Sequence, residues 1–95
     1  MGAEQRIVSR VHAIRRMFER QISVDDVCEA LATGQIIEEY PEDVPYPIRL
    51  VLGRAGNRPI HVVAAHNRDD EEVVVITAYE PDPAQWDREF KRRRT

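Results

Sequence analysis

The chain has 95 residues, of which 42% are hydrophobic and 33% are charged, and its formal net charge is −3 at pH 7. This length predicts a single domain over residues 1–95, and no apolar run approaches the ~20 residues needed to cross a bilayer. The negative charge argues against a general nucleic-acid-binding protein, and the presence of one cysteine excludes an internal disulfide.

The first ten residues, MGAEQRIVSR, lack the apolar core of a secretory signal peptide. The cysteine, Cys28, falls in a helical pattern, which indicates a small core residue and suits a reducing compartment. We therefore expect a cytoplasmic protein that does not associate with membranes.

Two short amphipathic helices are predicted near the start of the chain. Ser9 is a suitable N-cap for a helix over residues 10–20, in which apolar residues recur at helical spacing. Ser23 and Asp26 have the spacing of a capping box, so a second helix is predicted over residues 23–33.

Four strands are predicted after the helices. Short runs rich in Val, Ile, Thr and Tyr predict strands over Gln35–Tyr40, Arg49–Arg54, Ile60–Ala65 and Val73–Tyr79. The last two strands form a hairpin across the polar link His66–Glu72. Consecutive strands joined by short links pair as an antiparallel meander, with both helices laid across one face.

The register of the central hairpin is predicted to bring polar side chains together. If Ala65 pairs with Val73 next to the loop, His61 lies opposite Thr77. Tyr79 then lies one step further along the same face.

A short C-terminal helix is predicted over residues 83–92. Asp82 is a suitable cap, Pro83 fits the first helical position, and Trp86 and Phe90 share one face that would pack on the sheet. The predicted fold class is α+β, with two N-terminal helices packed on a four-stranded antiparallel sheet and a short C-terminal helix.

No Gly-rich phosphate loop, Cys-x-x-Cys or His-Glu-x-x-His motif is present, and we expect no metal site and no cofactor. A set of polar residues interrupts the otherwise apolar elements: His12, Arg16, His61, Thr77 and Tyr79. A structural role is the alternative for each of them, since a buried histidine can be a satisfied core residue and a tyrosine can anchor a strand end.

The segments HAIRRMFERQISVDDVCEAL, GQIIEEYPED, RPIHVV and ITAYEPDPAQW resemble an uncharacterised bacterial family, the domain of unknown function 4258. The resemblance extends from about Ser9 to Arg93. That family is similar to the RelE and BrnT toxins, which are small metal-free ribonucleases with N-terminal helices on an antiparallel sheet. Some of its members resemble partners of zinc-finger antitoxins of the MqsA kind. This chain departs from RelE-like toxins because it is acidic and contains one Lys.

The resemblance implies a metal-independent endoribonuclease, the toxin component of a toxin–antitoxin pair, with RNA and a cognate antitoxin as partners. The residues at the family's own positions, which we expect to be catalytic, are His12, Arg16, His61 and Tyr79. The residues expected to bind substrate are Arg20, Thr77, Arg92 and Arg93. We expect the four catalytic side chains to meet between the first helix and the central hairpin.

Within this hypothesis Arg16 holds the phosphate, His12 and His61 act as acid and base, and Tyr79 is a positioning donor or second acid. One alternative is a non-enzymatic interaction or regulatory module that keeps the toxin-like fold, which the acidic balance favours. Another is a pocket for a small molecule or peptide built from the same polar residues.

Overall fold

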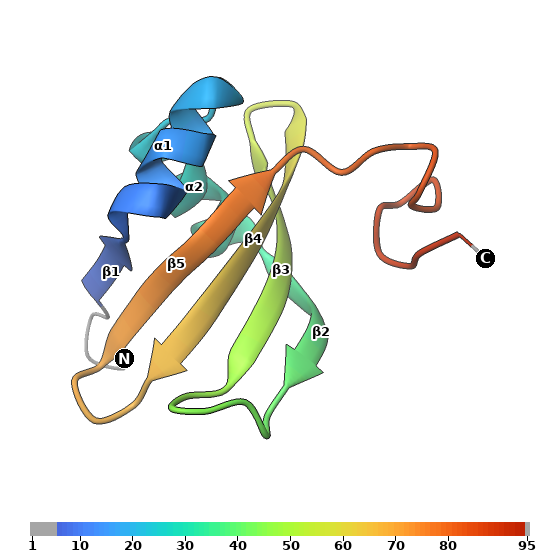
Figure 1. Ribbon diagram of the computed structural model, residues 1–95. Coiled ribbons are helices and arrows are strands. Elements are labelled where there is room, and N and C mark those ends of the chain that lie inside the picture. The colour runs from blue at the N-terminus through green and yellow to red at the C-terminus, as the bar shows by residue number, and fades with distance from the viewer. Residues whose placement is uncertain (1–5, 95) are drawn as a thin grey trace.

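The structure, a computed structural model, describes residues 6–94, so half of the segment searched for a signal peptide lies outside the described residues. Its elements are β1 (Arg6–Ser9), α1 (Val11–Glu19), α2 (Val24–Thr33), β2 (Gln35–Tyr40), β3 (Ile48–Ala55), β4 (Arg58–Asn67) and β5 (Glu72–Tyr79). The strands form one mixed sheet in the order β1-β5-β4-β3-β2, with α1 and α2 on the same side of it (Figure 1). Within residues 6–94, neither helix has the length and apolar character needed to cross a membrane.

The sheet corrects the predicted fold, because it has five strands and one parallel pair. Strands β2 to β5 pair as the expected antiparallel meander, but β1 adds to the edge of β5 in parallel. Ser9 ends this strand and is not a helix cap; the N-cap of α1 is Arg10, with no side-chain hydrogen bond. The four residues of β1 contain two apolar side chains, Ile7 and Val8, and pair with a strand far away in the sequence. Such a strand has too little local pattern to be recognised.

Helix α2 is fixed at its start and along its packed side. Ser23 and Asp26 form the predicted capping box, each side chain accepting the backbone N–H of the other at 3.0 Å. The helix then packs closely on β3 at Gly53, where an added Cβ would lie 1.8 Å from the Ala30 carbonyl oxygen. Only glycine allows this approach, so the sequence sets how deeply α2 sits on the sheet.

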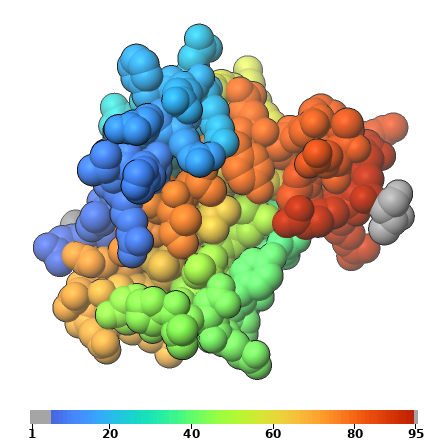
Figure 2. Space-filling model, in the orientation of Figure 1, coloured from blue at the N-terminus to red at the C-terminus, as the bar shows by residue number. Residues whose placement is uncertain are grey.

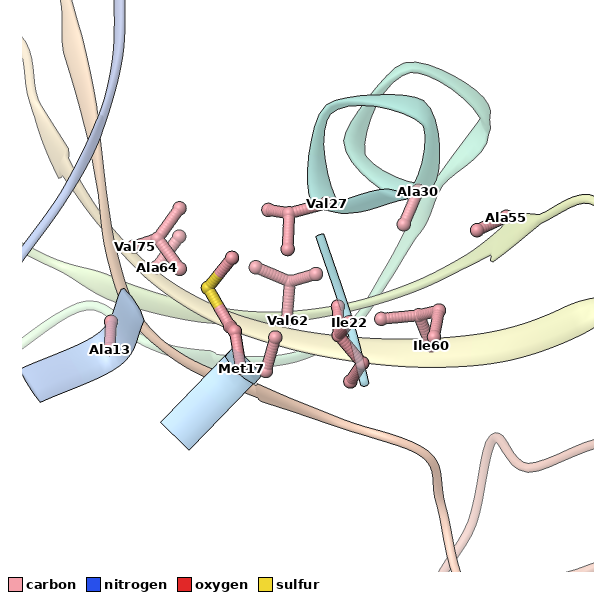
Figure 3. Close-up of a cluster of buried hydrophobic side chains, with 11 residues drawn as sticks. Ala13, Met17, Ile22, Val27, Ala30, Ala55, Ile60, Val62, Ala64 and Val75 are labelled. Atoms are coloured by element: carbon pink, nitrogen blue, oxygen red, sulfur yellow. The ribbon is translucent and has the colours of Figure 1, made fainter. Parts of the chain in front are cut away.

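The core lies between the helices and the sheet (Figure 3). Met17 of α1 and Val27 of α2 meet Val62 of β4, and all three are almost completely buried. The remaining members of this cluster are Ala13, Ile22, Ala30, Ala55, Ile60, Ala64, Val75 and Ala78. We call the side of the sheet that they cover the helix face.

The central hairpin has a different register from the expected one. The observed pairs are Ala65 with Val74, Ala64 with Val75, Val63 with Thr77 and His61 with Tyr79. The pairing of Ala65 with Val73, and with it the position of His61 opposite Thr77, was therefore wrong. Next to the loop, the observed register differs from the predicted one by one residue. A β-bulge at Ile76 shifts it by one more, because it inserts an unpaired residue into β5.

The predicted C-terminal helix is absent, and residues 80–94, which we call the C-terminal segment, form turns. Asp82 does begin one turn, because its side chain accepts the Ala84 N–H at 2.8 Å. Asp87 begins a second turn, since its carboxylate accepts the N–H groups of Glu89 and Lys91. These bonds compete with the helical ladder, so the chain turns back on itself. As a result, Trp86 pairs with Arg93 through the backbone.

Candidate functional site

The candidate site lies on the face of the sheet opposite the helices, which we call the far face. Val62 and Ala78 belong to the core on the helix face, so their neighbours His61 and Tyr79 point to the other side. The C-terminal segment reaches this side after leaving β5, and its Trp86 is only 2% exposed (Figure 1). In Figure 2 it forms an orange-to-red lobe beside the strands.

His61 is completely buried and has a partner for each ring nitrogen. Nε2 lies 2.8 Å from the Phe90 carbonyl oxygen, and Nδ1 lies 3.3 Å from the Tyr79 hydroxyl. A carbonyl oxygen can only accept, so Nε2 carries the proton and Nδ1 accepts from the tyrosine. Burial lowers the pKa of His61, against the opposing effects of the Phe90 carbonyl and the Glu38 carboxylate. The imidazole is therefore neutral near pH 7.

Tyr79 is the member of this pair that reaches solvent. Burial raises the pKa of its phenol, while the positive charge of Arg93 lowers it. The hydroxyl is thus protonated near neutrality and donates to Nδ1 of His61. The Phe90 carbonyl, the His61 imidazole and the Tyr79 hydroxyl form a chain of orienting group, base and hydroxyl, the arrangement that activates a hydroxyl in many enzymes.

Two guanidinium groups stand near Tyr79. Arg20, which follows α1, donates to the Thr77 hydroxyl at 3.2 Å and to the Ala78 carbonyl at 2.8 Å, so it reaches around the end of β5 to the far face. Arg93 comes from the C-terminal segment and lies 4.7 Å from the centre of the Trp86 ring. Both positive charges act on the phenol of Tyr79. This arrangement could bind an anion beside the hydroxyl.

The aromatic ring of Trp86 connects the buried and exposed parts of this site. Its ring meets the His61 ring edge-on, with the ring centres 4.4 Å apart. The ring also contacts the guanidinium of Arg93. Sequence reasoning had assigned Trp86 to a helix, so its place against His61 was missed.

Glu38 and Tyr40 complete the site and were also missed. The Tyr40 hydroxyl donates to Glu38, and this bond lowers the pKa of the carboxyl group. Glu38 also pairs with Arg93, whose Nε lies 3.4 Å from Oε2. Two residues apart on a strand, Glu38 and Tyr40 share a face, and this alternation was the available signal in the sequence.

The expected meeting of all four catalytic candidates does not occur. His61 and Tyr79 are in contact, and Arg20, Thr77 and Arg93 lie around them. His12 and Arg16 instead occupy the exposed surface of α1, which packs on the opposite face of the sheet.

Arg92 is exposed, and its carbonyl accepts the Asp87 N–H at 2.8 Å. Across residues 6–94, no three His, Cys, Asp or Glu side chains gather closely enough to hold a metal ion.

Comparison with known proteins gives a family and no further relative. A family model described as Domain of unknown function (DUF4258) matches residues 10–80. No curated protein and no solved structure matches the chain, and none of these comparisons connects it with the RelE or BrnT toxins. The matched region includes His61 and Tyr79 and ends before Trp86 and Arg93.

Proposed function

The chain belongs to the family described as Domain of unknown function (DUF4258), and because that description names no activity, we propose a function from the far face. The protein is a metal-independent endoribonuclease, the toxin component of a toxin–antitoxin pair. The observation that supports this proposal is the His61–Tyr79 pair with the guanidinium groups of Arg20 and Arg93 beside it.

The chemistry follows from what this pair can do with a proton. In RNA cleavage without a metal, the ribose 2′-oxygen bonds to the adjacent phosphorus and the bond from phosphorus to the 5′-oxygen breaks. The 2′-hydroxyl gives its proton to the Tyr79 oxygen while the Tyr79 proton passes to Nδ1 of His61. The leaving 5′-oxygen takes a proton from water, and the hydroxide that remains takes back the proton held by His61 through Tyr79. The products are a 2′,3′-cyclic phosphate and a 5′-hydroxyl, and the His61–Tyr79 pair is restored.

Arg20 and Arg93 supply positive charge where the phosphorane develops its negative charge. The buried imidazole does not touch RNA, so His61 acts through Tyr79 as a positioning residue and proton store. This division of roles replaces the earlier assignment of His12 and His61 as acid and base.

His12 and Arg16 retain a role as contacts to the RNA backbone. Spaced four residues apart, His12, Arg16 and Arg20 follow one side of α1 and lead to Thr77 on the far face. A single strand lying along this side would place successive phosphates beside these basic side chains.

The test is cleavage of a fluorescent single-stranded RNA by the purified protein with excess chelator. Tyr79→Phe should lower the rate by ~10²–10⁴, whereas Tyr46→Phe, a tyrosine in the loop before β3, should not change it. A substrate with deoxynucleotides in place of all ribonucleotides should remain intact. Chelator-sensitive cleavage, or equal rates for the two tyrosine variants, would refute the proposal.

A second candidate function, a protein-interaction module, is favoured by the outer side of α1. Val11 is 70% exposed and Phe18 is 83% exposed, and with Ile14 they form an apolar stripe at helical spacing. Arg10 and Arg15 flank this stripe. Its occupant is an acidic amphipathic helix of a partner protein, because such a helix matches both the apolar stripe and the positive flanks.

This second function predicts that a synthetic acidic amphipathic helical peptide binds the protein and that Phe18→Ser abolishes binding. Val44→Ser is the matched control, since Val44 is 87% exposed in a loop away from α1. Equal binding by the two variants would exclude a partner helix on this stripe. Self-association of the protein through Phe18 at high protein concentration would exclude it as well.

A further inference from the structure

A separate hollow lies on the helix face, where α2 overhangs the sheet. It has a volume of about 370 Å³ and is lined by residues from α2 and all five strands. Its apolar wall includes Cys28, Leu31, Val51 and Val73. The volume is at the small end of the range of ~300–1,000 Å³ for ligand pockets, so a small ligand fits it best.

Two basic residues lie where this pocket adjoins a second hollow. Arg49 and His66 line it there, and both also line a second hollow of about 410 Å³ that contains Arg68. Burial lowers the pKa of His66, and the charges of Arg49 and Arg68 lower it further. An anion placed between these side chains would offset the positive charge of Arg49 and Arg68.

Arg49 is suited to bind that anion. Its guanidinium is largely shielded, and its Nε lies 3.3 Å from the carboxylate of Glu39, a side chain that is 56% exposed. Because the Glu39 carboxylate is exposed to solvent, this ion pair contributes little stability, so a ligand can replace Glu39 at low cost. The planar guanidinium matches the two oxygens of a carboxylate.

We propose that this pocket binds a small apolar carboxylate, with its hydrocarbon part against Leu31, Val51 and Val73 and its carboxylate at Arg49 and His66. The site is distinct from the far face and does not depend on the proposed ribonuclease activity. The same chemistry could come from a medium-chain fatty acid or from the C-terminal residue of a peptide.

The experiment is a calorimetric titration of the full chain with octanoate, with octanol, and with a short peptide ending in Leu. Octanoate or the peptide should bind, and octanol should bind more weakly. Binding of octanoate would indicate a fatty acid as the ligand, and binding of the peptide would indicate a peptide C-terminus. Arg49→Gln should weaken binding by ~10-fold or more. Arg54→Gln is the matched control, because Arg54 lies on the same strand, is exposed, and does not line the pocket.

Two further measurements keep the test decisive if Arg49→Gln disturbs the fold. Bound octanoate should slow the alkylation of Cys28, because the thiol lines the pocket. Ala32→Trp, a change at an exposed residue of the same lining, should block binding while circular dichroism remains unchanged. Failure of both carboxylates to bind, equal affinity for octanoate in the two arginine variants, or binding unaffected by Ala32→Trp would overturn the proposal.

Discussion

On β4, the neighbouring residues Val62 and His61 are both completely shielded from solvent, but by different parts of the chain. Val62 is covered by α1 and α2 and contacts other apolar side chains (Figure 3). His61 is covered by the C-terminal segment, which contributes the Trp86 ring and the Phe90 carbonyl. The helix face is thus held by apolar packing, whereas the far face depends on a segment without regular secondary structure. A buried polar site can therefore be built on a strand whose alternate residues form an ordinary core.

The largest effect is expected from removing the ring that covers His61. Trp86→Ala should lower the free energy of unfolding by ~3–5 kcal/mol, because it leaves a cavity and exposes the imidazole. Phe18→Ala is the control, since Phe18 is exposed and its removal should change stability by less than about 0.5 kcal/mol. Chemical unfolding should be followed by circular dichroism, as Trp86 is the only tryptophan. Equal midpoints for the two variants would show that the far face does not contribute to stability.

A smaller effect is expected on the helix face at the contact between α2 and β3. Gly53→Ala should cost about 1–3 kcal/mol, because the new methyl group meets the Ala30 carbonyl and the helix must move outward. Gly56 provides the control: it has a φ of 62°, and an added Cβ meets nothing within 4 Å. Gly56→Asn should therefore cost only a few tenths of a kcal/mol, since Asn tolerates this conformation. Thermal unfolding of both variants checks the difference, and a tolerated Gly53→Ala would contradict the close approach.

The helix face was largely predictable from the sequence and the far face was not. The capping box at Ser23 and the helical spacing that follows it are local signals, and they correctly gave α2. The meander was likewise visible from short strands and short links. These features depend on residues that are close in the sequence, and a sequence pattern records such local relations.

The misplaced parts depend on contacts between distant residues. Three features were missed: the pairing of β1 with β5, the bulge at Ile76 and the fold-back at Asp87. Each depends on hydrogen bonds whose partners cannot be identified from the sequence of one segment. His61 and Tyr79 were correctly placed on one face of the sheet, but His61 was paired with Thr77 instead of Tyr79. Their covering residue and their acidic neighbour Glu38 could not be placed without the path of the C-terminal segment.

The pH dependence of stability should separate the two faces. Burial lowers the pKa of both His61 and His66 below the ordinary 6.5, so the unfolded chain binds more protons than the folded one as the pH falls below that value. Stability is then complete above pH ~6.5 and decreases below it, towards the folded-state pKa values. His61→Gln should remove more of this decrease than His66→Gln, because His61 is the more deeply buried. Denaturant unfolding of both variants between pH 7 and 5 measures the slopes, and an unchanged slope for His61→Gln would contradict a neutral imidazole.

The smallest effect on stability is expected for Arg93, and it separates folding from function. Its side chain is 60% exposed, and its pairing with Glu38 and Trp86 lies at the surface, so Arg93→Gln should change the free energy of unfolding by no more than about 1 kcal/mol. If Arg93 binds an RNA phosphate, the same change should reduce the slope of log K against log salt by ~0.7. Arg6→Gln is the matched control, because Arg6 is exposed on β1 and pairs with Glu72 there. A salt slope that falls equally in both variants would mean that positive charge attracts RNA generally. That result would contradict binding of RNA at the far face.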